Sequence, residues 1–187
     1  MSYVIATLFQ NQIIMASDGR VISHNKQPIQ EDYKKITKVG YCLVGYSGDK
    51  EYCEMLLREV SRESRILIYA EQVQQKIIEK INSLSFKGNA KIIIAGTSMI
   101  SANINNNKVL IGLDSKDLSL ILTKHSSSDL EYVTASSEYL DKNLAHSIEY
   151  QTFTTYPGTV KDKITEIVKR ISKEDFSVND TVFFEIL

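Results

Sequence analysis

The sequence has few residues that interrupt helices and strands. Among 187 residues there are two prolines and eight glycines, and there is no tryptophan. No stretch rich in proline, glycine or serine separates one part from another, and 43% hydrophobic residues are enough for a sizeable core. We therefore expect a single domain over residues 1–187.

Cysteine and long apolar runs are also scarce. The two cysteines are Cys42, in an expected strand, and Cys53, in an expected helix. The sequence shows no eighteen-residue apolar span, and we expect no secretory leader. A disulfide framework is thus excluded, and we expect the reducing cytoplasm as the compartment.

An excess of charge of either sign is missing as well. The 22 basic and 23 acidic residues are mixed along the chain and leave a formal net charge of −1. Such a balance leaves no excess of basic residues for binding nucleic acid or an anionic membrane, so neither partner is expected. His24, His125 and His146 stand far apart and form no metal-ligand spacing with the cysteines, so we expect no metal ion and no cofactor.

Short apolar runs and amphipathic repeats come in blocks, which predict strands and helices respectively. The expected strands are 4–9, 13–16, one beginning at 32–36, 41–44, 91–96, 109–114, 118–123, 130–135 and 181–187. The expected helices follow Gly48, cover 70–84, begin with the cap Ser136-Ser137-Glu138, and follow Pro157-Gly158-Thr159. Two sheets between two helical layers would bury such strands on both faces, although the pattern alone also fits another α+β fold.

Residues of catalytic type stand at the ends of the first predicted strands. Ser2 heads the first hairpin, and Asp18 closes its second strand. The next strand begins with the pair Lys34-Lys35, and a later one ends in Val44-Gly45-Tyr46-Ser47-Gly48-Asp49. Taken singly, each is also explained by a turn, a solvated charge or relief of backbone strain. Their joint order and spacing is what indicates a site.

This order resembles, over about residues 2–57, the start of proteasome β subunits and of their bacterial relative, the HslV peptidase. Both belong to the N-terminal-nucleophile hydrolases, whose mature chain begins with Thr or Ser, with an acid sixteen positions later and a lysine from the next strand. Asp18 fits, because 18 − 2 = 16. The lysine corresponds to Lys35 if one residue is inserted in the loop 24–31, and to Lys34 otherwise. We take Lys35, because the Lys-Lys-apolar pattern then matches.

The resemblance implies an α+β chain folded as a four-layer αββα sandwich, in which Ser2 is the nucleophile. A serine hydroxyl needs a base, and no His/Asp pattern stands near Ser2. If Met1 is removed, the α-amino group of Ser2, with an ordinary pKa of about 7.7–8.0, can serve as general base and then as general acid. A retained Met1 would turn this amine into an amide.

The resemblance also assigns roles around that serine. Lys35 would favour the alkoxide and the neutral amine, and Asp18 would keep Lys35 charged and oriented. The N–H of Gly45 would bind the oxyanion, and a glycine would be needed there because a side chain would block the substrate carbonyl. Arg20 would line part of the substrate pocket.

Two further family features correspond less directly to this sequence. The serine that supports the N-terminal amine falls on Ala135, with Ser136 or Ser137 as substitutes. The late acid falls on Glu174, which has the right interval to Ser177, or on Asp175, which has the right residue type. No glycine follows Ser177.

The resemblance predicts a cytoplasmic, threonine/serine-type peptidase that cleaves peptide or protein substrates through an acyl-enzyme on Ser2. Family membership further implies a homo-oligomeric ring and an ATP-dependent unfoldase as a partner. Two alternatives stay open: an N-terminal-nucleophile amidase that acts on a small amide, and a catalytically inactive ring subunit. Ala135, the missing glycines and any retained Met1 would favour the inactive subunit.

Overall fold

The computed structural model describes residues 2–23, 25–62, 67–85, 88–100, 107–116, 118, 120–125 and 129–187, with residues 120–125 described by their backbone. Met1, whose removal we expect, and His24 lie outside the described residues. The strands are β1 Val4–Phe9, β2 Gln12–Asp18, β3 Val21–Ile22, β4 Pro28–Gln30, β5 Ile36–Val39, β6 Cys42–Gly48, β7 Ala90–Thr97, β8 Lys108–Asp114, β9 Leu120–His125, β10 Glu131–Ala135 and β11 Val182–Ile186. The helices are α1 Lys50–Arg62, α2 Ala70–Ser83, α3 Lys142–Thr155 and α4 Val160–Glu174.

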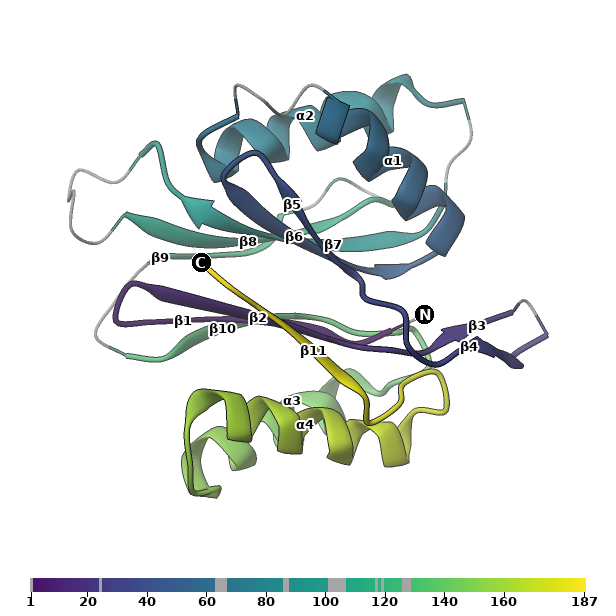
Figure 1. Cartoon of the computed structure of the whole chain (residues 1–187), viewed down its shortest axis with the longest axis vertical. Coiled ribbons are helices and arrows are strands. Elements are labelled where there is room, and N and C mark those ends of the chain that lie inside the picture. Colours follow the sequence, from purple (N-terminus) through teal and green to yellow (C-terminus); the bar gives the residue numbers. More distant parts are fainter. Residues whose placement is uncertain are drawn as a thin grey trace.

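The strands form two main antiparallel sheets and one short hairpin. One sheet has the order β10-β1-β2-β11, the other the order β5-β6-β7-β8-β9, and β3 pairs with β4. The two main sheets face each other, with α1 and α2 outside the five-stranded sheet and α3 and α4 outside the four-stranded sheet (Figure 1). The predicted mixture of helices and antiparallel sheets is therefore confirmed.

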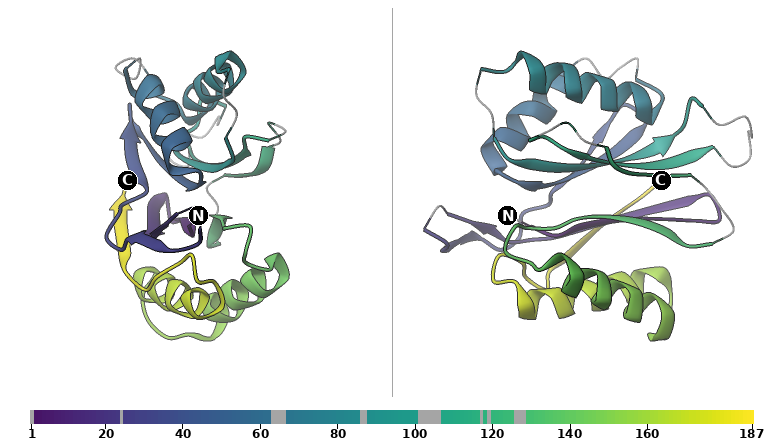
Figure 2. Two further views of the ribbon diagram at one scale, coloured as in Figure 1. Left: turned by 90° about the vertical axis from the view of Figure 1, so that its right-hand side faces the viewer. Right: turned by 180° about the vertical axis from the view of Figure 1, so that it is seen from behind.

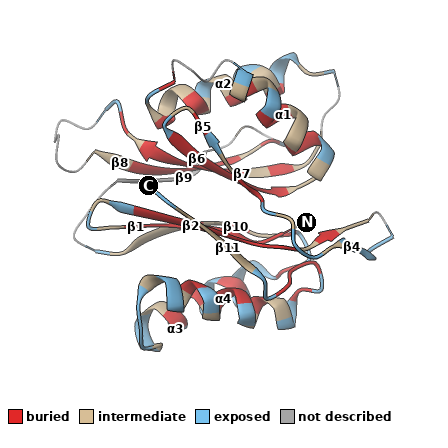
Figure 3. Ribbon diagram, in the orientation of Figure 1, coloured by how far each residue is buried: buried red, intermediate tan, exposed pale blue. Residues whose placement is uncertain are grey.

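Alternation along the strands explains why both faces of each sheet are buried. On β1, the alternate residues Val4, Ala6 and Leu8 pack between the sheets, whereas Ile5 packs against α3 and α4. Buried residues line the facing strands, and exposed residues gather on the outer sides of the helices (Figure 3). Within the described ranges, no helix is long and apolar enough to cross a membrane.

The start of β1 lies at the end of the sheet pair that carries the β3–β4 hairpin, as two views agree (Figures 1 and 2). The predicted hairpin of the first two strands is present. Its connecting residues Gln10 and Asn11 have positive φ angles of 47° and 62°, which is typical of a two-residue turn that fixes strand register. Val4 then lies opposite Ser17, which places Tyr3 beside Asp18.

Three of the expected elements differ from the structure. The third helix begins at Lys142 rather than at Ser136, because the Asp141 carboxylate accepts the N–H groups of Asn143 and Leu144 at 3.0 and 2.9 Å and is the N-cap. The strand expected from residue 32 pairs only from Ile36. The loop expected at 24–31 contains β4, which pairs with β3 directly before it.

Candidate active site

The backbone around Ser2 is fixed by both sheets. Ser2 is buried, and its carbonyl accepts a hydrogen bond of 2.8 Å from Ser47 Oγ on β6. The next residue, Tyr3, donates its N–H to Asp18 Oδ1 at 2.9 Å and accepts the Asp18 N–H at 3.1 Å. The Asp18 carboxylate is therefore held directly against the chain that follows the expected nucleophile.

Asp18 and Lys35 form a buried ion pair. Lys35 Nζ lies 2.8 Å from Asp18 Oδ1 and 3.2 Å from the Asp18 carbonyl, and the two side chains are 2% and 0% exposed. The Arg20 N–H donates to Asp18 Oδ2 at 2.9 Å. The neighbouring Lys34 instead pairs with Glu185 at the surface. Of the two lysines that the sequence left open, Lys35 is the one that the fold brings to Asp18.

Burial acts against both charges of this pair. It raises the pKa of Asp18, although Lys35 and the N–H groups of Tyr3 and Arg20 act in the opposite direction. It lowers the pKa of Lys35, and the Asp18 carboxylate acts to raise it. Each charge is thus stabilised chiefly by its partner, and loss of one would leave the other buried without compensation.

Arg20, which the resemblance places in a substrate pocket, makes contacts that fix the chain around Asp18. Its Nε lies 3.0 Å from Glu31 Oε2, and its Nη1 donates to the Phe176 carbonyl at 2.7 Å. Asn179 completes this support: it accepts the Gly19 N–H at 2.8 Å and donates to the Glu31 carbonyl at 2.7 Å. Together these contacts fix the turn that follows Asp18.

The N–H of Gly45 is used inside the sheet. Gly45 lies opposite Ile36 of β5 and Ile93 of β7. On the β5 side, the Tyr46 N–H donates to the Lys35 carbonyl. Because hydrogen-bonded and non-hydrogen-bonded pairs alternate along an antiparallel ladder, the Gly45 N–H points to Ile93 on β7. The geometry therefore gives no support to the oxyanion role predicted for Gly45.

The reason predicted for a glycine at position 45 also needs correction. A Cβ atom there would lie 2.7 Å from Val4 Cγ1 and 2.9 Å from Met15 Sδ. These atoms belong to the core between the sheets rather than to an open cleft. Close approach of the two sheets, and not access for a substrate carbonyl, requires glycine here.

The late acid and the serines form a second buried cluster. Asp175 ends α4 and is 1% exposed; its carboxylate accepts Ser137 Oγ on one oxygen, and the Ser177 N–H and Oγ at 2.8 and 2.7 Å on the other. Glu174 is exposed. Of the alternatives in the sequence, Asp175 and Ser137 contact each other, while the carbonyl of Ser136 accepts Lys91 Nζ at 2.8 Å.

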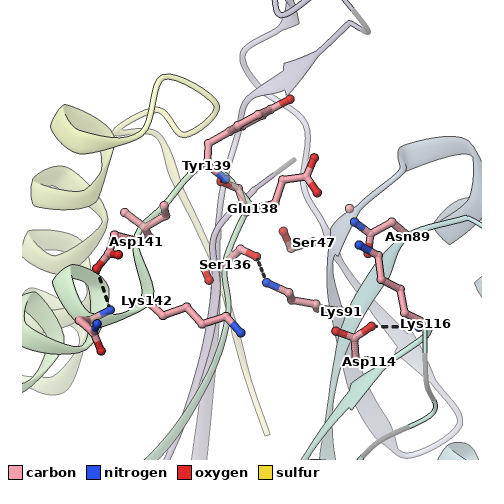
Figure 4. A pocket seen from close by; sticks show the side chains of 14 residues that line it. Ser47, Asn89, Lys91, Asp114, Lys116, Ser136, Glu138, Tyr139, Asp141 and Lys142 are labelled. Carbon is pink, nitrogen blue, oxygen red and sulfur yellow. Dashed lines mark hydrogen bonds between the residues drawn. The ribbon is translucent and has the colours of Figure 1, made fainter.

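A polar cavity of about 800 Å³ opens beside these groups. Its lining comes from β6, β7, β8 and the connection from β10 to α3, and includes Ser47, Lys91, Asp114, Ser136, Tyr139 and Lys142 (Figure 4). Ser47 also donates to the Ser2 carbonyl, so the cavity begins one side chain away from the expected nucleophile. No group of three or more His, Cys, Asp or Glu side chains that could hold a metal ion occurs among the described residues.

Comparison with known proteins bears on the fold. The sequence matches no family model and no curated protein. Among solved structures, it is similar to the crystal structure of eukaryotic HslV from Trypanosoma brucei, with a TM-score of 0.69 over 99% of this chain and 98% of that chain. This chain has the fold of HslV. The sequence identity is 12%, so the likeness shows the fold alone.

Within this HslV fold, a buried carboxyl anchors the first strand. Glu149 of α3 is 3% exposed, and its Oε1 accepts the Tyr3 hydroxyl at 2.7 Å. Burial raises the pKa of Glu149, while the hydrogen bonds from Tyr3 and Thr134 and the charge of His146 act to lower it. The residue after Ser2 is thus held from both sides, by Asp18 at its backbone and by Glu149 at its side chain.

The raised pKa of Glu149 predicts a pH dependence of stability. A carboxyl whose pKa is higher in the folded than in the unfolded chain stabilises the fold below the unfolded value, and this stabilisation is lost as pH rises through the folded value. Glu149→Gln keeps an acceptor for Tyr3 but cannot ionise. We expect its free energy of unfolding, relative to wild type, to increase as pH rises from 4 to 8 in denaturant titrations.

Gln151→Ala, at an exposed position of α3, is the control; because neither residue ionises, its difference from wild type is expected to stay constant over the same pH range. A Glu149→Gln difference that does not change with pH would contradict the assignment of a raised pKa.

Several functional contacts could not be found in the sequence. Ser47 stands in the run quoted above, but its bond joins β6 of one sheet to Ser2, which precedes β1 of the other. Tyr3 and Glu149 are 146 positions apart, and Gly19 and Asn179 are 160 apart. No local pattern marks such partners.

Proposed function

We propose that this chain is a proteasome-like hydrolase of the N-terminal-nucleophile type, which cleaves peptide bonds with Ser2. The observation that carries the proposal is the buried Asp18–Lys35 ion pair, bonded to the backbone directly after Ser2, in a chain with the HslV fold. The two facing sheets and their outer helices would then be the four-layer αββα sandwich of that class.

The proposed mechanism uses the groups around Ser2. Once Met1 is removed, the neutral α-amino group takes the proton of Ser2 Oγ, which attacks the carbonyl carbon of the scissile bond. The tetrahedral intermediate collapses to a serine ester, and the leaving amine takes the proton from the α-ammonium group. Water, deprotonated by the α-amine, then attacks the ester; the bond between the acyl carbon and Ser2 Oγ breaks, Oγ takes the proton back from the α-ammonium group, and the acid product leaves. The Lys35 charge favours the neutral amine and the alkoxide.

The inactive-subunit alternative is favoured by one observation. The Gly45 N–H is committed to β7, so the oxyanion donor would have to come from elsewhere. An amidase that acts on a small amide would use the same steps as the peptidase. Turnover of peptides, compared with turnover of small amides, separates these possibilities.

Assembly and partners follow the same proposal. We propose a homo-oligomeric ring in the cytoplasm that takes peptide or unfolded protein substrates, with an ATP-dependent unfoldase as a partner. The mass of the purified protein in solution tests the ring, because a subunit of 21.2 kDa that stays monomeric would contradict it.

The chemical state of the N-terminus and the Ser2 side chain test the function. We expect intact-mass measurement to show loss of Met1 from the wild type and from Ser2→Ala and Ser2→Thr. Ser2→Thr should retain peptide hydrolysis, whereas Ser2→Ala should lose at least about 10³-fold in kcat/KM. Fluorogenic peptides and simple amides serve as the substrates.

Ser2→Ala should melt at the wild-type temperature, since its loss concerns the reacting atom. A retained Met1, together with turnover that is equal in wild type and Ser2→Ala, would overturn the proposal and support the inactive subunit.

A further inference from the structure

The cavity beside Ser2 receives a row of side chains from three neighbouring strands. Ser47 of β6 lies opposite Lys91 of β7, and Lys91 lies opposite Asp114 of β8. Directly opposed residues of an antiparallel sheet project from the same face. Lys91 therefore leaves the sheet on the side of Ser47, whose hydroxyl contacts the Ser2 carbonyl. Its ammonium group reaches across to the Ser136 carbonyl at the end of β10.

Three lysines, Lys91, Lys116 and Lys142, line this cavity. Lys91 is half-buried, and its Nζ donates a hydrogen bond of 2.8 Å to the neutral carbonyl of Ser136. Figure 4 shows the ammonium groups of Lys91 and Lys142 directed into the same space. Burial first, and then the charges of Lys142 and Lys116, lower the pKa of Lys91, whereas the charges of Asp114 and Glu138 act to raise it. In the described part of the chain, neither Lys91 nor Lys142 makes an ion pair within 4.0 Å.

Two acids of the cavity, Asp114 and Asp141, accept hydrogen bonds from backbone N–H groups. Asp114 Oδ1 accepts the Lys116 N–H at 2.9 Å. Asp141 Oδ1 accepts the first N–H groups of α3 as its cap. Glu138 is exposed at the rim and has no such bond among the described contacts. A carboxylate brought in by a ligand would therefore meet the ammonium groups of Lys91 and Lys142, and it would compete with Asp114 and Glu138 for them.

We propose that this cavity is a carboxylate subsite, in which Lys91 and Lys142 bind an Asp or Glu side chain that lies next to the scissile bond of a peptide. The proposal rests on the proposed function for the position of that bond. Ammonium–carboxylate hydrogen bonds are among the stronger ones, and partial burial of Lys91 reduces their screening by water. The volume of about 800 Å³ is in the range of small-ligand pockets and admits a side chain with its flanking backbone.

Binding to Ser2→Ala protein tests this subsite without turnover. The probes are fluorescein-labelled hexapeptides of alanine and serine, each with a single Asp, Asn or Lys at one position in turn. We expect one or two adjacent positions at which Asp binds about tenfold more tightly than Asn, and Lys more weakly than either, by fluorescence anisotropy.

Variants of the lysines make the test specific. Lys91→Met and the exposed Lys142→Met, each added to Ser2→Ala, should bring the Asp/Asn ratio to about one, while Lys91→Arg should retain it. Glu138→Gln should raise the ratio, because it removes a competing carboxylate. Lys169→Met, at an exposed position on α4, is the matched control and should leave the ratio unchanged. Thermal melting checks that Lys91→Met is folded. Because Lys142 is exposed, Lys142→Met tests carboxylate binding without the removal of a partly buried side chain.

The failure of this inference is distinct from the failure of the proposed function. Equal affinity for Asp and Asn peptides, no detectable binding of any peptide, or a ratio that survives both lysine variants would overturn the subsite. A ratio that depends on the lysines, in a wild-type protein with no Ser2-dependent turnover, would support the subsite and overturn the peptidase.

Discussion

Replacement of Lys35 with methionine is expected to lower Ser2-dependent hydrolysis by about 10² to 10³-fold and the free energy of unfolding by about 3–5 kcal/mol. Methionine removes the ammonium group and leaves the fully buried Asp18 without its ion partner. The pKa of Asp18, already raised by burial, should then rise further, since Lys35 no longer acts to lower it. The stability deficit should therefore shrink as pH falls and Asp18 takes up a proton.

Two matched variants separate the role of Lys35 in catalysis from its role in stability. Lys34→Met removes the neighbouring lysine, whose partly exposed pair with Glu185 should contribute no more than about 1 kcal/mol. In the double variant Asp18→Asn, Lys35→Met, no unpaired charge is buried, so much of the stability should return while hydrolysis stays lost. Chemical denaturation and peptide turnover measure the two effects. Turnover in Lys35→Met near the wild-type rate would remove the ion pair from the proposed mechanism.

Replacement of Asp175 with alanine is expected to cost about 3 kcal/mol of unfolding free energy. The carboxylate is fully buried and accepts hydrogen bonds from Ser137 and from the backbone and side chain of Ser177. Alanine leaves these donors buried and unpaired, and it also detaches the end of α4 from the connection that carries Ser137. Because that connection lines the cavity beside Ser2, peptide hydrolysis should fall together with stability.

Glu174→Ala is the control, since this neighbouring acid is exposed and should change stability by less than about 0.5 kcal/mol. Asp175→Asn keeps one acceptor oxygen and should be intermediate. Equal effects of Asp175→Ala and Glu174→Ala in denaturation curves would show that the buried cluster does not contribute to the free energy of unfolding.

Much of the fold was predicted from the pattern of apolar residues. Strands other than β3 and β4 were found as short apolar runs, because both faces of the main sheets are buried, and helices were found from apolar residues three and four positions apart, because one face of each helix is buried. The start of a helix was predicted less well where a capping side chain determines it. Ser136 and Asp141 both have side chains that can cap a helix, and only the contacts of the folded chain assign Asp141 to α3 and Ser137 to Asp175.

The candidate site was also predicted in part, where its geometry depends on a single hairpin. The distance of sixteen positions between Ser2 and Asp18 is a property of one hairpin: a two-residue turn at Gln10 and Asn11 fixes the register, and the register places Tyr3 beside Asp18. Such local relations can be predicted from the sequence, because turn and strand geometry depend on adjacent residues.

Tertiary structure alone decided which of several equivalent residues turns inward. Lys34 and Lys35 are adjacent and chemically alike, but opposite sides of an extended chain send one to Glu185 at the surface and the other to buried Asp18. The direction of the Gly45 N–H likewise depended on which strands flank β6. The sequence by itself determined the elements, the first hairpin and the residue types available for chemistry. Packing of the two sheets determined which of them meet, because burial and pairing of charge arise only between segments distant in the chain.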